Sequence, residues 1–280
     1  MIKLDESVIK HVESGFHIPP KPEILNTIQD IANDPEGSIS DIGDCVASDV
    51  GLSSAVLKTL NSPFYGMSRT ISDVRQATMM LGIESIKALV ASYEIRRAFT
   101  GDSCISLERF WDSAAEIANA MVFIGKRVNS NIPLENLHVT GLFHDCGLPA
   151  MSIKFPDYVD TLRQANEQPN LLLTELEEER YHCNHAVIGY YIASSWGLPK
   201  ELCSVILQHH AMDALNGKVS SEFLWMYSCL KAAENLVEQT RRFKPTTDWI
   251  RVGDQVLAAM GLSDLDYSDI EEDYNNLALE

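Results

Sequence analysis

The sequence predicts an all-α protein, a multi-helix bundle without a sheet. Apolar residues recur at the three- and four-residue spacing of a buried helix face through most of the 280 residues. No segment shows the alternation with a period of two that is typical of a half-buried strand. One run rich in β-branched residues, Val205-Ile206-Leu207, continues a helical stripe that begins at Leu202.

The first hundred residues are predicted to form short helices joined by turns. Residues 2–14 have helical spacing, and the proline-rich stretch 16–22 that follows suits a helix start better than a helix interior. Further helices are expected over residues 24–33, 38–46, 50–60, 74–81 and 83–99. Gly101-Asp102-Ser103 is the clearest break, so we predict an N-terminal helical lobe over residues 1–102.

The second half continues the helical pattern. Residues 107–128 outline a long helix with Trp111 on its apolar face, and Trp196 lies on a later apolar face. Further helices are expected over residues 134–144, 158–165, 175–179, 185–192, 202–209, 221–240 and 247–260, followed by an acidic tail with Asp264, Asp266, Asp269, Glu271, Glu272 and Asp273. We predict a second helical lobe over residues 103–280 with an acidic C-terminal extension.

The charge balance excludes several classes of partner. The chain carries 40 acidic against 22 basic residues, a formal net charge of −18. Such a surface repels phosphate backbones and anionic lipid, so we expect neither direct nucleic-acid binding nor membrane docking. The one short basic cluster, Arg241-Arg242-Phe243-Lys244, is explained by a solvated helix end.

Cysteine usage and the N-terminus favour a cytoplasmic protein. Six cysteines are scattered without a Cys-x-x-Cys pair, and most lie inside apolar patterns, where free thiols behave as small core residues. This pattern argues against a zinc ribbon or a disulfide framework. We therefore expect the protein in a reducing compartment, where thiols stay free. The start of the chain lacks the features of a signal peptide, and no run of about 18 apolar residues could span a membrane.

An adjacent His-Asp pair in Phe143-His144-Asp145-Cys146-Gly147 is the centre of the functional pattern. The pair closes an apolar helical run, and Gly147 is the expected helix stop. Imidazole plus carboxylate suits a borderline or hard divalent metal ion. Neighbouring helical residues point about 100° apart, so both can reach one ion only from the rim of a helix. Downstream, His182, His185 and the pair His209-His210 offer further ligands.

Some of these histidines also have structural explanations. The pair His209-His210 closes an apolar helix, where positive charge interacts favourably with the helix macrodipole. His182 fits an exposed helix residue. His11, His17 and His138 have no partner in the pattern, and we assign them no chemistry.

Two parts of the chain resemble HDOD domains. The first comprises residues 49–66, with the core Val56-Leu57-Lys58-Thr59-Leu60-Asn61-Ser62-Pro63-Phe64-Tyr65-Gly66, then Ile71-Ser72-Asp73-Val74-Arg75-Gln76-Ala77 and Leu81-Gly82. The second comprises Phe110-Trp111, Gly141-Leu142-Phe143-His144-Asp145-Cys146-Gly147, His185-Ala186-Val187-Ile188-Gly189, Trp196-Gly197-Leu198-Pro199 and Ile206-Leu207-Gln208-His209-His210. The resemblance covers about residues 16–215 in consistent order.

HDOD domains are similar to HD phosphohydrolases and are mostly regarded as signalling or regulatory modules. The resemblance implies an HD-like second lobe and carries over these metal-ligand positions: His144, Asp145, His185, His209 and His210. Two positions depart from the phosphohydrolase pattern. Ser113 stands where an upstream histidine is expected, and the closing aspartate falls near Glu234, whose carboxylate could still ligate.

Two functions follow from this resemblance. The first is a cytoplasmic signal-transduction protein, a binding or scaffold module with a degenerate metal site, a signalling protein as partner and room for a small-molecule or nucleotide ligand. The second is a metal-dependent phosphohydrolase of a nucleotide or cyclic dinucleotide, with Asp145 as the catalytic metal bridge. Ser113 favours the first, and the retained ligands keep the second open. Iron, manganese, nickel or zinc suit such ligands and calcium does not, and a site without metal also fits the first function.

Overall fold

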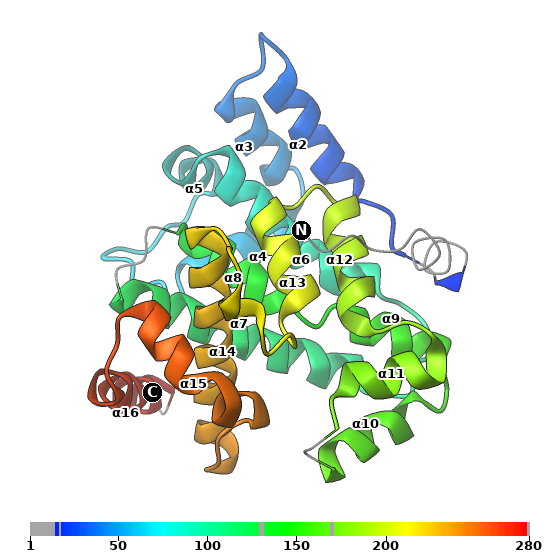
Figure 1. Cartoon of the computed structure of the whole chain (residues 1–280). Coiled ribbons are helices and arrows are strands. Elements are labelled where there is room, and N and C mark those ends of the chain that lie inside the picture. Colours follow the sequence, from blue (N-terminus) through cyan, green and yellow to red (C-terminus); the bar gives the residue numbers. More distant parts are fainter. Residues whose placement is uncertain (1–14, 17, 129–131, 169–170, 279–280) are drawn as a thin grey trace.

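The computed structural model describes residues 15–16, 18–128, 132–168 and 171–278, and it confirms the all-α prediction. No strand occurs in these ranges, and Figure 1 shows helices stacked around a common centre. The helices are α2 (Glu23–Asn33), α3 (Ile39–Ala47), α4 (Val50–Leu60), α5 (Val74–Leu81), α6 (Ile83–Ala98), α7 (Leu107–Arg127), α8 (Leu134–Phe143), α9 (Gly147–Lys154), α10 (Tyr158–Glu167), α11 (Leu173–Tyr181), α12 (His185–Ser195), α13 (Lys200–Gln208), the single-turn 3-10 helix η1 (Ala214–Asn216), α14 (Ser221–Arg242), α15 (Thr247–Met260) and α16 (Asp264–Ala278). The helix expected over residues 2–14, with His11, and His17 lie outside the described residues.

Side-chain caps fix where several of these helices begin. At the start of α3, Ser38 Oγ accepts a hydrogen bond from the backbone N–H of Asp41, and the Asp41 carboxylate accepts one from the backbone N–H of Ser38. Asp49 and Ser220 cap α4 and α14 in the simpler one-way form. Each cap satisfies a donor that the helix itself leaves unpaired, and each stabilises its helix by about 1 kcal/mol.

The N-terminal helices share one core with the rest of the chain. α3 packs against α5, α4 against α6, and α6 against α8. Trp196 ties the chain start to this core, because its indole N–H donates to the carbonyl of Pro19 at 3.0 Å. Trp111 and Trp196 are both buried, as expected. The division into lobes at residue 102 stays a prediction.

Helices α7, α8 and α14 form the centre of the molecule. α7 and α14 run antiparallel, since Cys229 Sγ meets the carbonyl of Met121 and Arg241 meets Ser113 at the opposite end. α8 lies directly against α7 at Gly141, where an added Cβ would stand only 2.6 Å from the Cα of Ala118. The glycine therefore lets two helix backbones touch, and this contact fixes the position of α8.

The segment read as an acidic tail is a packed helix, α16. Tyr267, Ile270 and Tyr274 are buried at helical spacing, while its carboxylates cover the opposite face. The Tyr267 hydroxyl donates to the carbonyl of Ala232 at 3.1 Å and accepts from the Asn235 amide at 3.0 Å. The sequence did not predict this helix, because only these three buried residues mark its apolar face among many acidic residues. Among the described helices, none combines the length and apolar composition that a bilayer crossing requires.

Candidate metal centre

The His-Asp pair lies at the junction of two helices. α8 ends at Phe143, His144 is its C-cap, and Asp145 stands on the turn that leads to α9. Gly147 is not the helix stop that the sequence suggested, because it is the first residue of α9. A Cβ at this position would lie 2.0 Å from the backbone carbonyl of His185, so only glycine allows α9 to approach the start of α12.

The other histidines arrive at the same place from two more helix ends. His185 is the first residue of α12, whose N-cap Asn184 accepts from the backbone N–H of Val187 at 2.9 Å. His209 is the C-cap of α13, and His210 follows it. α12 packs against both α9 and α13; in Figure 1, α12 and α13 lie near the middle and α9 lies to their lower right. Side chains held by helices are positioned more precisely than side chains on loops, which favours a fixed ligand geometry.

Four of the expected ligands converge on one point. Asp145, His185, His209 and His210 each offer an atom, and these atoms lie within 4.8 Å of one another. Asp145 Oδ1 is 3.3 Å from His185 Nε2 and 3.1 Å from His209 Nε2. His185 Nε2 is 3.1 Å from His210 Nε2 and 3.4 Å from His209 Nε2. Two ring nitrogens at such separations cannot both present lone pairs, so either an N–H of one ring or a metal ion lies between them.

The remaining two expected ligands lie on the other side of Asp145. His144 Nε2 is 3.2 Å from Asp145 Oδ2 and 3.7 Å from Glu234 Oε1 on α14. The two oxygens of Asp145 thus face different groups, as a bridging carboxylate would. The hydroxyl of Ser113 hydrogen-bonds a residue outside this cluster, because it accepts from Arg241 at 3.0 Å. Arg241 also pairs with Glu116.

Outer hydrogen bonds set the orientation of the imidazoles. His144 Nδ1–H donates to the carbonyl of Gly141, and His209 Nδ1–H donates to the carbonyl of Ile206, each at 2.7 Å. His185 Nδ1–H donates to the buried carboxylate of Glu177 at 2.7 Å. A carbonyl or carboxylate can only accept, so each of these rings turns its Nε2 inward as the atom free to ligate. This arrangement fits a metal ion of the kind that imidazole binds.

The buried carboxylate of Glu177 accepts three hydrogen bonds. Besides the His185 ring, it accepts from the backbone N–H of His185 at 3.0 Å and from the hydroxyl of Tyr158. Burial alone would lower the pKa of His185, but Glu177 and Asp145 outweigh burial and raise that pKa to about 10. Burial would likewise raise the pKa of Asp145, yet His144, His185 and His209 hold it well below its ordinary value. A metal ion entering the cluster therefore competes with a proton for His185.

A buried lysine lies beside the cluster. Lys231 is 1% exposed, and its ammonium donates to Glu234 at 2.9 Å and to Asp248 of α15 at 2.7 Å. Burial would lower the pKa of Lys231, but the two carboxylates raise it above its ordinary value, so the ammonium stays charged. Burial lowers the pKa of His210, and the charges of His209 and Lys231 lower it further. Lys231 thus already binds one oxygen of each of two carboxylates that could otherwise have ligated a second ion.

Sequence reasoning missed Glu177, Lys231, Asp248 and Tyr158. The clearest missed signal was Lys231, a lone cation inside the apolar run Cys229-Leu230-Lys231-Ala232-Ala233. The sequence places Glu177 in the helix expected over residues 175–179 but indicates no role for it. His182 is exposed, as expected, and adopts left-handed backbone at the end of α11.

The fold and this cluster define an all-helical protein with a buried carboxylate–imidazole site that could hold a metal ion. The family model described as HDOD domain matches residues 18–212. The chain belongs to the HDOD domain family.

Relatives and solved structures agree with this assignment. An uncharacterized protein of Treponema pallidum is 25% identical over 210 residues, which are 74% of this chain and 40% of that protein, so the chain spans less than half of this relative. An HDOD domain protein of unknown function from Geobacter sulfurreducens has a TM-score of 0.70 at 23% identity, covering 98% of this chain and 95% of that one. A Shewanella amazonensis protein named "Putative metal-dependent phosphohydrolase" has a TM-score of 0.64 at 18% identity, covering 96% and 97%. A Marinobacter aquaeolei protein named "Putative signal transduction protein" has a TM-score of 0.62 at 19% identity, covering 99% and 59%. At these identities the structures show the shared fold alone.

Proposed function

We propose that this chain is a regulatory module for signal transduction whose HD-type site binds a single divalent transition-metal ion. The ion would be held by Asp145, His185, His209 and His210, with His144 and Glu234 as neighbours. The observation that carries the proposal is the buried ammonium of Lys231, which binds Glu234 Oε2 and Asp248 Oδ2. Two-metal hydrolysis requires carboxylates free to hold both ions.

The residues present suit iron, manganese, nickel or zinc. Bound there, such an ion would act as a Lewis acid and fix the surrounding helix ends. The chain's own residues supply orientation: Glu177 turns His185 Nε2 inward, and Tyr158 steadies Glu177. The role we assign to the protein is to bind a signalling protein partner in the cytoplasm. All six cysteines are free thiols, which supports that compartment.

A metal-dependent phosphohydrolase acting on a nucleotide or cyclic dinucleotide is the second candidate. The bridging orientation of Asp145 between His144 and His209 favours it, since that carboxylate could serve two ions.

Metal stoichiometry combined with a hydrolysis assay distinguishes the two functions. Purified protein is loaded separately with Mn²⁺, Fe²⁺, Ni²⁺ or Zn²⁺, and bound metal is counted by elemental analysis. Hydrolysis of cyclic dinucleotides and of bis(p-nitrophenyl) phosphate is followed in the same samples. We expect one ion per chain, lost in Asp145→Asn, and no hydrolysis above that variant. Two ions per chain with hydrolysis that depends on Asp145 would overturn the regulatory proposal in favour of the enzyme.

A further inference from the structure

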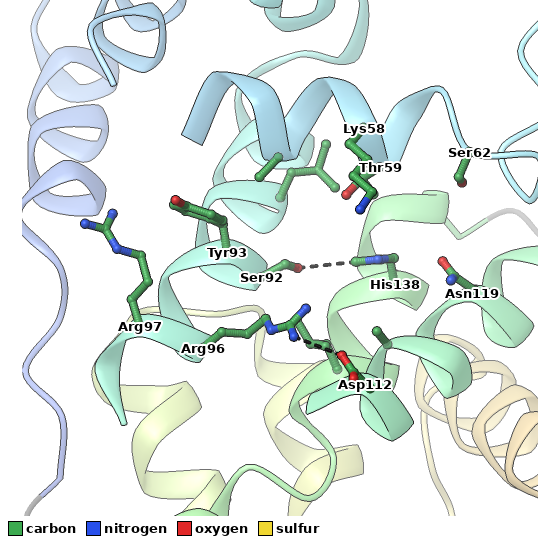
Figure 2. Close-up of a pocket in the computed structure, with 14 residues that line it drawn as sticks. Lys58, Thr59, Ser62, Ser92, Tyr93, Arg96, Arg97, Asp112, Asn119 and His138 are labelled. Atoms are coloured by element: carbon green, nitrogen blue, oxygen red, sulfur yellow. Dashed lines mark hydrogen bonds and ion pairs between the residues drawn. The ribbon is translucent and has the colours of Figure 1, made fainter. Parts of the chain in front are cut away.

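A cavity lies between the N-terminal helices and the centre of the fold. Its volume is about 530 Å³, and it is lined by α4, α6, α7 and α8 (Figure 2). Cavities that bind small molecules typically measure about 300 to 1,000 Å³. None of its lining residues belongs to the metal cluster.

The inner wall and the rim of this cavity differ in chemistry. Leu89, Leu142 and Ser92 are buried and line its inner part together with Ala115. Lys58 and Arg96 are exposed and stand at its rim, from α4 and α6 respectively. Figure 2 shows them on opposite sides of His138. The cavity therefore offers an apolar interior beneath cationic side chains.

The positive rim is unusual for this chain. The lining holds three cations, Lys58, Arg96 and Arg97, against one acid, Asp112, although the chain carries a net charge of −18. Arg96 pairs with Asp112 at 3.2 Å, and Arg97 pairs with Glu94 at 2.9 Å and with Asp49 at 3.5 Å. Among the described residues, no carboxylate pairs with the ammonium of Lys58. A cation retained without a partner beside a cavity favours an anionic guest.

Two polar groups inside the cavity keep unused hydrogen-bonding capacity. The Ser92 hydroxyl donates to the carbonyl of Ala88 at 3.1 Å, so its oxygen accepts from His138 Nδ1–H at 3.4 Å. This leaves His138 Nε2 as an acceptor. Within the described chain, no protein group hydrogen-bonds the carboxamide of Asn119, which also lines the cavity. Both groups could orient a guest that carries an N–H or O–H.

We propose that this cavity binds a small organic anion, a carboxylate or phosphate monoester on an apolar or planar body. The anionic group would lie between Lys58 and Arg96, and the body would occupy the space bounded by Leu89, Leu142 and Ala115. Asn119 and His138 would hydrogen-bond polar atoms of the body. The proposal stands independently of the metal centre.

Fluorescence titration of the full chain with anilinonaphthalene sulfonate tests the proposal. This dye combines an anionic group with an aromatic body, and its emission rises in apolar surroundings. We expect saturable binding of one dye per chain. Phenyl phosphate, benzoate and adenosine monophosphate serve as competitors, and whichever displaces the dye best identifies the anionic group and the body. Inorganic phosphate lacks a body and should displace little at equal concentration.

Variants locate the binding. Ala115→Trp should fill the cavity and weaken dye binding more than about tenfold, since the body loses its space. Thr59→Trp, on the opposite wall, fills the same space if Ala115→Trp does not fold. Lys58→Met should weaken binding about three- to fivefold, as expected for an exposed ion pair. Lys200→Met, an exposed lysine on α13, is the matched control and should change nothing.

Three results would overturn the proposal. The first is the absence of saturable binding for the dye and for every competitor. The second is unchanged dye affinity in the folded Ala115→Trp and Thr59→Trp variants. The third is displacement by inorganic phosphate as effective as displacement by phenyl phosphate.

Discussion

Replacing Lys231 by methionine tests whether its ammonium balances the charge beside the metal centre. Methionine keeps an unbranched side chain of similar volume but removes the charge. Each of the two contacts, at 2.9 and 2.7 Å, corresponds to about 6 kcal/mol of Coulomb attraction at an effective dielectric constant of 20. Desolvation of three charged groups offsets most of this, and removal of one partner from a buried ion pair typically costs about 3–5 kcal/mol. Glu234 and Asp248 keep 14% and 16% side-chain exposure, so we expect the lower end, about 3 kcal/mol at pH 7.

The measurement is equilibrium urea unfolding of the metal-free protein, followed by far-UV circular dichroism. Lys200→Met is the control, with an expected change within about 0.5 kcal/mol. The difference between wild type and Lys231→Met should shrink as the pH falls toward 4. Without the ammonium, the carboxylates take up protons more readily in the folded state than in the unfolded state, which stabilises the variant at low pH. The variant should also bind one more divalent ion than the wild type. An unfolding free energy within about 1 kcal/mol of wild type at pH 7 would refute the reasoning.

Three further outcomes are expected. Glu177→Gln should weaken metal binding about 10- to 100-fold, measured by calorimetric titration, because it disturbs the orientation of the metal-facing His185 ring; Glu179→Gln, on the same helix and exposed, should leave affinity unchanged. Burial lowers the pKa of His138 to about 4. This folded-state pKa lies below the unfolded value, so unfolding free energy should fall by about 2 kcal/mol between pH 7 and pH 5, a slope that His138→Leu should lack in urea unfolding. Gly147→Ala should destabilise the fold by about 3 kcal/mol in the same assay, since its Cβ would overlap the carbonyl of His185; an unchanged midpoint would contradict the close contact of α9 and α12.

The helices could be predicted because their signals are local. Apolar spacing and a capping residue such as Ser38 act within a few positions, and most predicted helix boundaries lie close to those observed. The order of the histidine segments could also be read from the chain. Their convergence followed from the resemblance to HD-type proteins, since no local rule brings His209 to Asp145 across the intervening helices.

The groups that surround the ligands could not be predicted in the same way. Glu177 sits among three other acids in α11, and only packing against Tyr158 and His185 distinguishes it from its solvated neighbours. The role of Lys231 depends on Asp248, which comes from a different helix. Helix α16 was obscured by its many carboxylates. The cavity lined by α4, α6, α7 and α8 arises from the way these four helices pack. No single residue in the sequence reveals that packing.

The buried ammonium of Lys231 also bears on when this protein acquires its shape. Many small metal-binding domains are unfolded until the ion arrives, because the free energy of metal binding supplies their free energy of folding. Here the ammonium of Lys231, which no chelator can remove, already pairs with both Glu234 and Asp248. We therefore expect the chain to complete its fold without a metal ion. Metal occupancy at Asp145 could then change while the protein stays folded. Such a change could serve as a reversible signal that does not require the protein to be degraded.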